Sequence, residues 1–162
     1  MIPNSKAFDG KSSYEYDGKI VQRWYRLAQM GQYLLRIVFV SSNSPIRQGI
    51  ALFFSDFKGK LLLNEEELPI LKGKFKHYTF MQDQVPNGTI LLSVDAEEGK
   101  LILANGSEQE NVGFDCGAFG CAFWIETIEE NYLRFHCNDH EYDDDFDDLI
   151  FDLYIEPLND GM

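Results

Sequence analysis

Basic residues are scarce in this chain: its 162 residues hold 14 Lys and Arg against 27 Asp and Glu, a formal net charge of −13. Nucleic acids and anionic membranes are bound chiefly through Lys and Arg, which displace counterions from phosphate groups. The composition therefore argues against DNA, RNA and membrane surfaces as partners. Hydrophobic residues make up 44% of the chain, which excludes a mostly disordered protein and is enough for a buried core.

Cysteines, long apolar runs and export signals are also scarce. Three cysteines, an odd number, do not make a closed disulfide framework, and no stretch reaches the roughly 18 apolar residues that span a bilayer. Because residues 1–30 contain no apolar signal-peptide core, we expect a cytoplasmic protein with reduced thiols. An extracellular location is the alternative if a signal peptide has been removed. In a protein that is not secreted, Asn87-Gly88 and Asn105-Gly106 are not glycosylation sites and predict two tight turns.

Short apolar runs separated by turn residues fill most of the chain. Residues 1–18 are an irregular lead-in, and residues 19–30 fit a helix or an edge strand, of which we favour the strand. Further strands are predicted at residues 33–41, 49–57, 60–63, 74–81, 89–95, 100–104, 121–128, 132–138 and 149–156. Turns are expected at 58–59, 96–99 and 129–131, and residues 65–71 have room for one helical turn. About nine such strands predict one all-β domain over residues 1–162, a two-sheet antiparallel β-sandwich of jelly-roll type.

Alternation in the last two strands predicts which side chains face the core. In residues 132–138, Leu133, Phe135 and Cys137 share one face, and Tyr132, Arg134 and His136 share the other. In residues 149–156, the core face is predicted to hold Leu149, Phe151, Leu153 and Ile155, and the outward face Ile150, Asp152, Tyr154 and Glu156. A β-sandwich requires that each strand has one buried face and one solvent-exposed face.

The acidity is concentrated in one segment. Residues 139–152 hold eight acids and no Lys or Arg, and 27 minus 8 leaves 19 acids against 14 basic residues elsewhere. Carboxylates this dense repel one another unless cations or backbone N–H groups compensate. Ca²⁺ prefers six to eight oxygen ligands, so the acidic loop at 138–148 is either a calcium-bound turn or a solvated loop anchored by Phe146, Leu149 and Phe151. The segment is not an EF-hand, because the glycine and glutamate of that loop are missing.

Residues 143–151, Asp-Asp-Asp-Phe-Asp-Asp-Leu-Ile-Phe, resemble the Asp-rich turn of calcium-dependent β-sandwiches in bacterial adhesins and sugar-binding modules. The resemblance implies that Asp143, Asp145 and either Asp147 or Asp148 hold Ca²⁺; Asp139 is a further candidate from the acidic run itself. Residues 14–104 are similar to carbohydrate-binding-module-like sandwiches. They are also similar to the small sandwich subunit of accessory Sec systems, a cytoplasmic subunit that acts in a glycoprotein-export complex.

Two other kinds of chemistry are compatible with parts of the sequence. Cys116, Cys121, Cys137 and His140 have zinc-ligand spacings, but Cys121 opens an apolar run and Cys137 points toward the core, which favours buried thiols. The abundant carboxylates would suit a glycosidase, yet we find no nucleophile elbow, phosphate-binding loop or zinc-protease motif. We therefore expect a protein that is not an enzyme.

Aromatic side chains on a wet sheet face can pack against sugar rings. The candidates are Trp24, Tyr25, Tyr78, Trp124 and Tyr154, of which Tyr78, Trp24 and Tyr154 are the predicted ligand-binding residues; Trp124 lies in an apolar run and fits the core better. The leading expectation is a non-enzymatic binding module for a carbohydrate or glycoprotein, with a structural calcium ion. The alternative is an interaction subunit of a protein-export or glycosylation complex, and a small hydrolase is the third reading.

Overall fold

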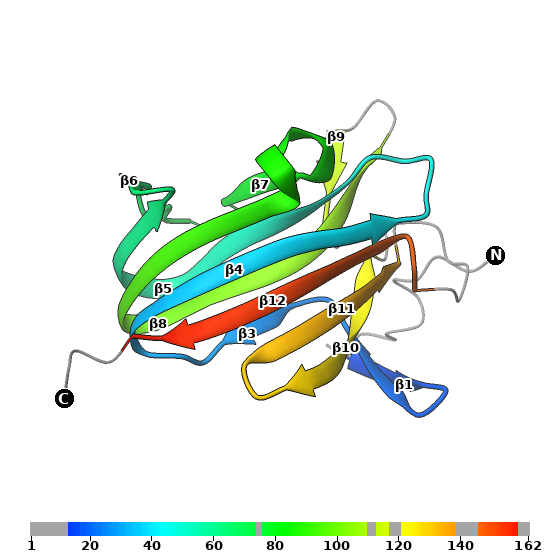
Figure 1. The fold of residues 1–162 in the computed structure, drawn as a ribbon, viewed down its shortest axis with the longest axis horizontal. Helices are drawn as coiled ribbons and strands as arrows, with labels where there is room; N and C mark the ends of the chain where they lie inside the picture. The colour runs from blue at the N-terminus through cyan, green and yellow to red at the C-terminus, as the bar shows by residue number, and fades with distance from the viewer. Residues whose placement is uncertain (1–12, 74–75, 110–112, 117–120, 139–145, 159–162) are drawn as a thin grey trace.

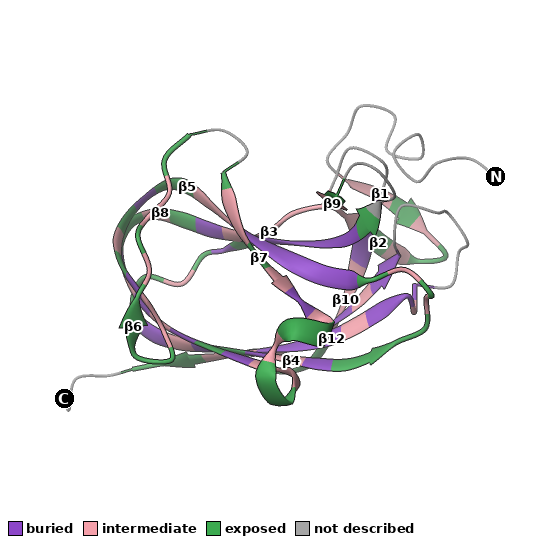
Figure 2. Cartoon of the chain, turned by 90° about the horizontal axis from the view of Figure 1, so that it is seen from above, coloured by how far each residue is buried: buried purple, intermediate pink, exposed green. Residues whose placement is uncertain are grey.

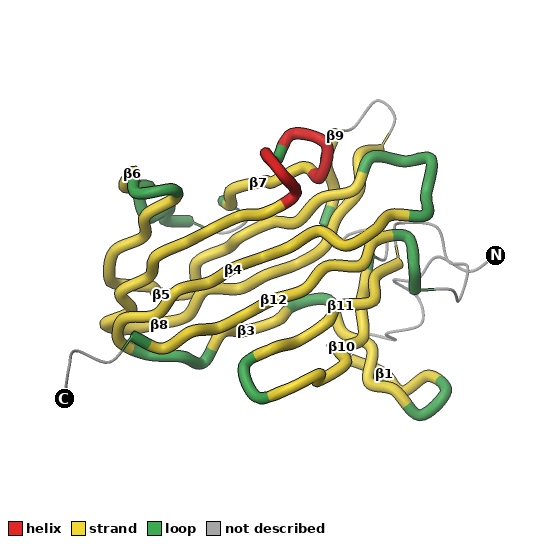
Figure 3. The backbone as a smooth tube through the Cα atoms, in the orientation of Figure 1, coloured by secondary structure: helices red, strands yellow, loops and turns green. Residues whose placement is uncertain are grey.

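The computed structural model describes residues 13–73, 76–109, 113–116, 121–138 and 146–158, and strands dominate them (Figures 1 and 3). The strands are β1 (Ser13–Tyr16), β2 (Lys19–Gln22), β3 (Tyr25–Leu27), β4 (Gly31–Ser42), β5 (Gln48–Leu63), β6 (Glu66–Glu67), β7 (His77–Met81), β8 (Thr89–Gln109), β9 (Gly113–Asp115), β10 (Ala122–Glu129), β11 (Tyr132–Asn138) and β12 (Leu149–Pro157). Two short 3₁₀ turns, η1 (Gln82–Gln84) and η2 (Pro86–Gly88), lie between β7 and β8. The predicted all-β fold is confirmed. Within the described ranges, no helix has the length and apolar character needed to cross a membrane.

Hydrogen bonds join all twelve strands into one antiparallel sheet rather than two separate ones. Its order is β1-β2-β10-β11-β12-β4-β8-β5-β6, with β3 and β9 added on β8 and β7 added on β5. The two longest strands each take part in both layers of the fold. The first half of β8 pairs with β4, whereas its second half pairs with β3 and β9. Figure 2 shows the sheet folding over at the end where β5 and β8 bend.

The bends replace two turns that the sequence predicts at 58–59 and 96–99, and both predictions are wrong. β5 and β8 continue through these residues and stay paired, with register shifts between Ser55, Lys58 and Gly59. Gly59 and Gly99 have positive φ angles of 152° and 75°. A Cβ atom at Gly59 would overlap the Asp95 carbonyl oxygen, and one at Gly99 would overlap the carbonyl of Asp56. The glycines therefore mark a bulge where two backbones touch, not a chain reversal.

Of four other local predictions, two are confirmed and two are wrong. Asn87-Gly88 lies in η2, with φ at Asn87 of 56°, and is the predicted tight turn. Asn105-Gly106 is instead a buried part of β8, paired with Ile50 and Gly49. Residues 65–71 contain no helical turn, because a tight turn at Asn64-Glu65 leads straight into β6. The strand reading of residues 19–30 is confirmed by β2 and β3.

The core lies between the two layers and follows the predicted alternation in β11 and β12. Phe135, Cys137, Leu149, Phe151 and Leu153 are all fully buried. The rings of Phe135 and Phe151 stack with centroids 4.4 Å apart, and Phe123 lies 4.9 Å from Phe135. These contacts fix β10, β11 and β12 side by side, so that their opposite face is held as one continuous surface.

The bend at Gly99 gives a test of the fold. Gly99 and Gly18 have nearly the same φ, 75° and 76°, but a Cβ meets backbone atoms only at Gly99 and meets nothing within 4 Å at Gly18. We expect Gly18→Ala to lower the free energy of unfolding by about 1 kcal/mol, the cost of the left-handed conformation. Gly99→Ala should cost at least about 2 kcal/mol more, because the new methyl group overpacks the bend. Denaturant unfolding measures both, and equal losses would contradict the bend.

Candidate binding surface

The solvent-facing side of β10, β11, β12, β4 and the first half of β8, called the outer face below, collects aromatic and charged side chains. Cross-strand register pairs Trp124 with His136, and Glu126 with Arg134, which in turn is paired with Asp152. A third row joins Tyr132 on β11, Tyr154 on β12 and Arg36 on β4. Because cross-strand neighbours in register lie within contact distance, each row is a ladder of side chains across the sheet.

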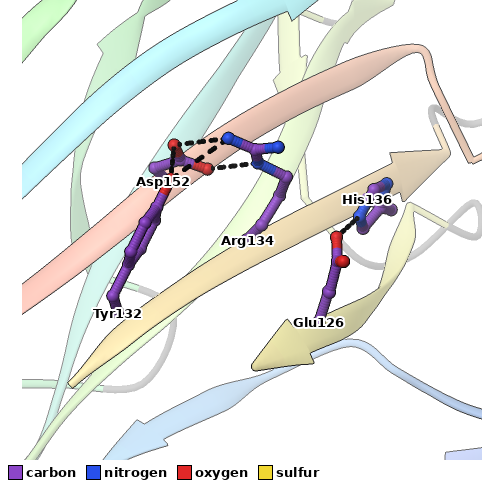
Figure 4. A network of polar contacts seen from close by, with 5 residues as sticks. All are labelled: Glu126, Tyr132, Arg134, His136 and Asp152. Carbon is purple, nitrogen blue, oxygen red and sulfur yellow. Dashed lines mark hydrogen bonds and ion pairs between the residues drawn. The ribbon is translucent and has the colours of Figure 1, made fainter. Parts of the chain in front are cut away.

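Asp152 is the centre of the best-ordered polar network on this face (Figure 4). Arg134 donates from Nε to Asp152 Oδ1 over 2.8 Å and from Nη2 to Oδ2 over 3.1 Å, and the Tyr132 hydroxyl donates to Oδ2 over 2.8 Å. The Asp152 side chain is only 5% exposed, whereas that of Arg134 is 33% exposed. The prediction that Asp152 faces outward is right about the face but wrong about its exposure, because Arg134 and Tyr132 cover the carboxylate.

This network also changes the acid–base properties of its members. Hydrogen bonding to Asp152 raises the pKa of the Arg134 guanidinium above its ordinary value. Hydrogen bonding with Tyr154 and then with Asp152 raises the pKa of Tyr132 to about 12. Both groups therefore keep their protons throughout the physiological range, which holds the fork of donors on Asp152 in place.

A second ladder surrounds Trp124. The His136 ring stacks on the indole with centroids 4.1 Å apart and planes at 5°, and Lys19 Nζ lies 4.9 Å from the ring centroid. His136 Nε2 is also 3.0 Å from Glu126 Oε1. Trp124 is half-buried and packs against a small second core of Val21, Ala122 and Phe146, so the interpretation of this residue as part of the core is right in part.

The three aromatic residues predicted to bind a sugar do not form one site. Tyr154 lies on the outer face, but its ring stacks on Tyr132 at 4.3 Å and carries the Arg36 guanidinium at 4.2 Å. Since β12 lies between β11 and β4, these partners cover opposite faces of the ring. Trp24 packs edge-on against Phe53 of β5 in the other layer.

Tyr78 lies apart from Tyr154, and its ligand-binding role stays a prediction. It lies on β7, is half-buried, and donates its hydroxyl to the Pro69 carbonyl oxygen over 2.6 Å. Its ring packs edge-on against Phe54 with centroids 6.0 Å apart. These contacts hold Pro69, which follows β6, and Phe54 of β5 next to β7.

The predicted calcium residues are only partly visible in the structure. Asp139, Asp143 and Asp145 lie outside the described residues. Asp147 Oδ2 accepts a hydrogen bond from Asn43 Nδ2 over 3.0 Å, while its Oδ1 atom is buried without a hydrogen bond from the described chain. Asp148 is 4% exposed. Among the described side chains, no three of His, Cys, Asp and Glu gather closely enough to hold a metal ion.

The cysteines match the buried-thiol interpretation. Cys121 and Cys137 are fully buried and Cys116 is half-buried, and His140 lies outside the described residues. Burial raises the pKa of the Cys137 thiol well above its ordinary value, with Cys121 and Asp148 adding to the effect. A neutral, buried thiol is neither a good nucleophile nor a ready metal ligand.

Comparisons with known proteins leave the function to be argued from this geometry. No family model matches the chain, and no curated protein matches it either. Sequence alternation did place Tyr132, Arg134 and His136 on one outward face. Arg36 was missed, because only the pairing of β4 with β12 brings it next to Tyr154.

The Asp152 network predicts a specific pattern of stability losses. Arg134→Ala should lower the free energy of unfolding by about 2 kcal/mol, because it leaves a buried carboxylate with one remaining donor. This is less than the roughly 3–5 kcal/mol for a fully buried pair, since Arg134 is partly exposed. Arg36 lies on β4, two strands away from Arg134 in the sheet. Arg36→Ala removes the contact with the Tyr154 ring and should lower the free energy of unfolding by under about 1 kcal/mol. Equal losses in chemical denaturation would contradict the network.

Proposed function

We propose that the chain is a non-enzymatic binding module that docks a basic protein partner on its outer face. The observation that carries the proposal is the composition of this surface. It combines Trp, Tyr and Arg side chains, the residues that most often anchor protein interfaces, with exposed aliphatic ones. Val40 is 48% exposed and Leu91 is 38% exposed, and Leu91 is paired with Arg36.

Charge supports a basic partner. One hollow of about 290 Å³ at the end of the outer face is lined by Arg36, Tyr132 and Tyr154 and by the three acids Glu129, Glu130 and Glu156. Lys or Arg side chains of a partner would pair with these three carboxylates, which outnumber the single guanidinium. The net charge of −13 steers basic proteins toward the chain and repels a second copy of it.

This proposal favours the alternative expectation, an interaction subunit, over sugar stacking on the outer face. A sugar ring needs the open face of an aromatic side chain, and both faces of Tyr154 are covered. The likeness to the small subunit of accessory Sec systems stays a prediction, as does the absence of catalysis.

The docking proposal is tested by two variants that differ only in where a charge is added. Leu91→Asp adds a carboxylate to the outer face, and Leu158→Asp adds one at an equally exposed apolar position, 44% exposed, after β12. We expect a basic partner, identified by cross-linking to β4 or β8, to bind the wild type and the Leu158 variant. Its affinity for the Leu91 variant should fall by about tenfold or more.

Two results would contradict docking on the outer face. One is a partner whose affinity for the Leu91 and Leu158 variants is the same. The other is a set of cross-links confined to β5, β7 and β9 of the other layer. Binding should also weaken as salt is added, because the rim carboxylates act through charge.

We further propose that the acidic turn holds a structural Ca²⁺ ion. The buried Asp147 Oδ1 atom supports this, since a buried carboxylate oxygen without a partner is costly unless a cation neutralises it. The Phe146 N–H donates to Asn138 Oδ1 over 2.7 Å, which holds Phe146 next to the end of β11. Asn138 and Phe146 are both buried, so this contact is part of the folded core.

Calcium removal tests this second proposal. If Ca²⁺ binds only the folded chain, a hundredfold excess over the dissociation constant should stabilise it by about 2.7 kcal/mol, and EDTA should reverse the rise in Tm. The shift should disappear in Asp147→Asn and persist in Asp17→Asn, whose side chain is 81% exposed in the β1–β2 turn. An unchanged Tm with both Ca²⁺ and EDTA would contradict the site.

A further inference from the structure

β7 is an edge strand, because β5 is the only described strand that pairs with it. It lies near the top of the view in Figure 1. Its five residues pair with Gly49 to Phe53 without a register shift. In the described chain, no backbone hydrogen bond outside the strands involves Thr79 or its neighbours Tyr78 and Phe80. The side of β7 that faces away from β5 therefore offers backbone N–H and C=O groups to a further strand.

The other described edge strands are charged or very short, and both features oppose the addition of a strand. Glu15 lies on β1 and Arg26 on β3, while β6 consists of Glu66 and Glu67 alone. β9 has three residues. By contrast, β7 reads His-Tyr-Thr-Phe-Met and contains no Lys, Arg, Asp, Glu or Pro. It is the described edge that is least protected against a further strand.

The sequence of β7 is complementary to itself in an antiparallel pair centred on Thr79. Such a pair sets Thr79 opposite the Thr79 of a second copy, and Tyr78 opposite its Phe80. Thr–Thr and aromatic pairs are favourable cross-strand neighbours, and two-fold symmetry makes the aromatic pair twice. Tyr78 and Phe80 pack against the core but are only half-buried, so a second copy would cover surface that the single chain leaves exposed.

The charges around β7 also suit an antiparallel pair of copies. Lys72 and Lys76 are exposed before the strand, and Asp83 is exposed after it. Arg47 donates to Asp83 over 2.7 and 2.8 Å and to Glu108 over 2.8 Å. Two-fold pairing brings the lysine end of one copy next to the Asp83 end of the other. These three basic and two acidic side chains contrast with the whole-chain charge of −13, so a second copy meets little local repulsion here.

We propose that two copies of the chain pair through β7 and form a symmetric dimer with one sheet continuous across the interface. Two five-residue strands make a small interface, so the dimer is weak and reversible. Added salt strengthens it, because salt screens the long-range repulsion between two chains of charge −13. This dependence is opposite to that of a basic partner on the outer face.

The dimer is tested by sedimentation velocity of the full chain over a range of protein concentrations. We expect the wild type to change from monomer to dimer as its concentration rises, and to do so at lower concentration in added salt. Thr79→Lys and Thr79→Glu should each weaken association by about tenfold or more, because like charges then face each other across the two-fold axis. An equimolar mixture of the two variants should restore the dimer. Thr79 is exposed, so both variants should keep the fold.

Thr127→Lys is the matched control, because Thr127 is an exposed threonine of β10, a strand that does not pair with β7. It should associate as the wild type does. The inference is overturned if the wild type stays monomeric throughout, if Thr79→Lys alone dimerises as well as Thr127→Lys, or if the mixture stays monomeric. Leu91→Asp should still dimerise, and Thr79→Lys should still bind a basic partner. Failure of the dimer and failure of docking are therefore separate results.

Discussion

The contact between the β5 and β8 backbones at their shared bend is the constraint on which the rest of the structure depends. Two strands can bend together only if neither places a Cβ atom between them, and Gly59 and Gly99 meet that requirement. The bend sends the first half of β5 and the second half of β8 into one layer and their other halves into the second. One continuous sheet can then enclose a core between two layers.

The two surfaces of functional interest follow from this geometry. In one layer, β4, β12, β11 and β10 lie next to the first half of β8, and their outer face holds the ladders around Trp124, Asp152 and Tyr154. Beside the bulge of β5, a cleft that Phe54 lines lies between this strand and residues 71–73. These residues lead toward β7, whose free edge is the second surface. The first surface is broad, aromatic and rimmed by acids, as a protein interface is. The second is narrow and offers backbone groups, as the edge of a sheet does.

The sequence predicted the parts of the fold that local patterns determine. Alternation identified Phe135, Phe151 and Leu153 as core residues, and the β10–β11 hairpin has its expected loop, because burial of one face leaves a period of two in the sequence. The sequence predicts turns at the two bends, because glycine beside polar residues is typical of a bulge and of a turn alike. Only cross-strand register, which joins Lys60 to Asp95, separates the two.

The candidate site was less predictable, because it too depends on cross-strand register. Tyr132 and Arg134 share a face by alternation alone, but the burial of Asp152 depends on both of them reaching across to β12. Arg36 joins Tyr154 only because β4 and β12, distant in sequence, are neighbours in the sheet. Tyr78 carries a surface-like pattern, yet its hydroxyl is used inside the fold. Pairing between distant strands is not encoded in any single segment.

The measurement that tests this account most directly is the set of backbone nuclear Overhauser effects around the bend. If β5 and β8 are continuous, the backbone protons of Val94 are close to those of Leu61, and those of Ala104 are close to those of Ala51, in line with the register. A hairpin at residues 96–99 would instead bring Asp95 next to Lys100. Cross-peaks for the first two pairs are the predicted result, and a strong Asp95–Lys100 cross-peak in their absence would contradict the bent sheet.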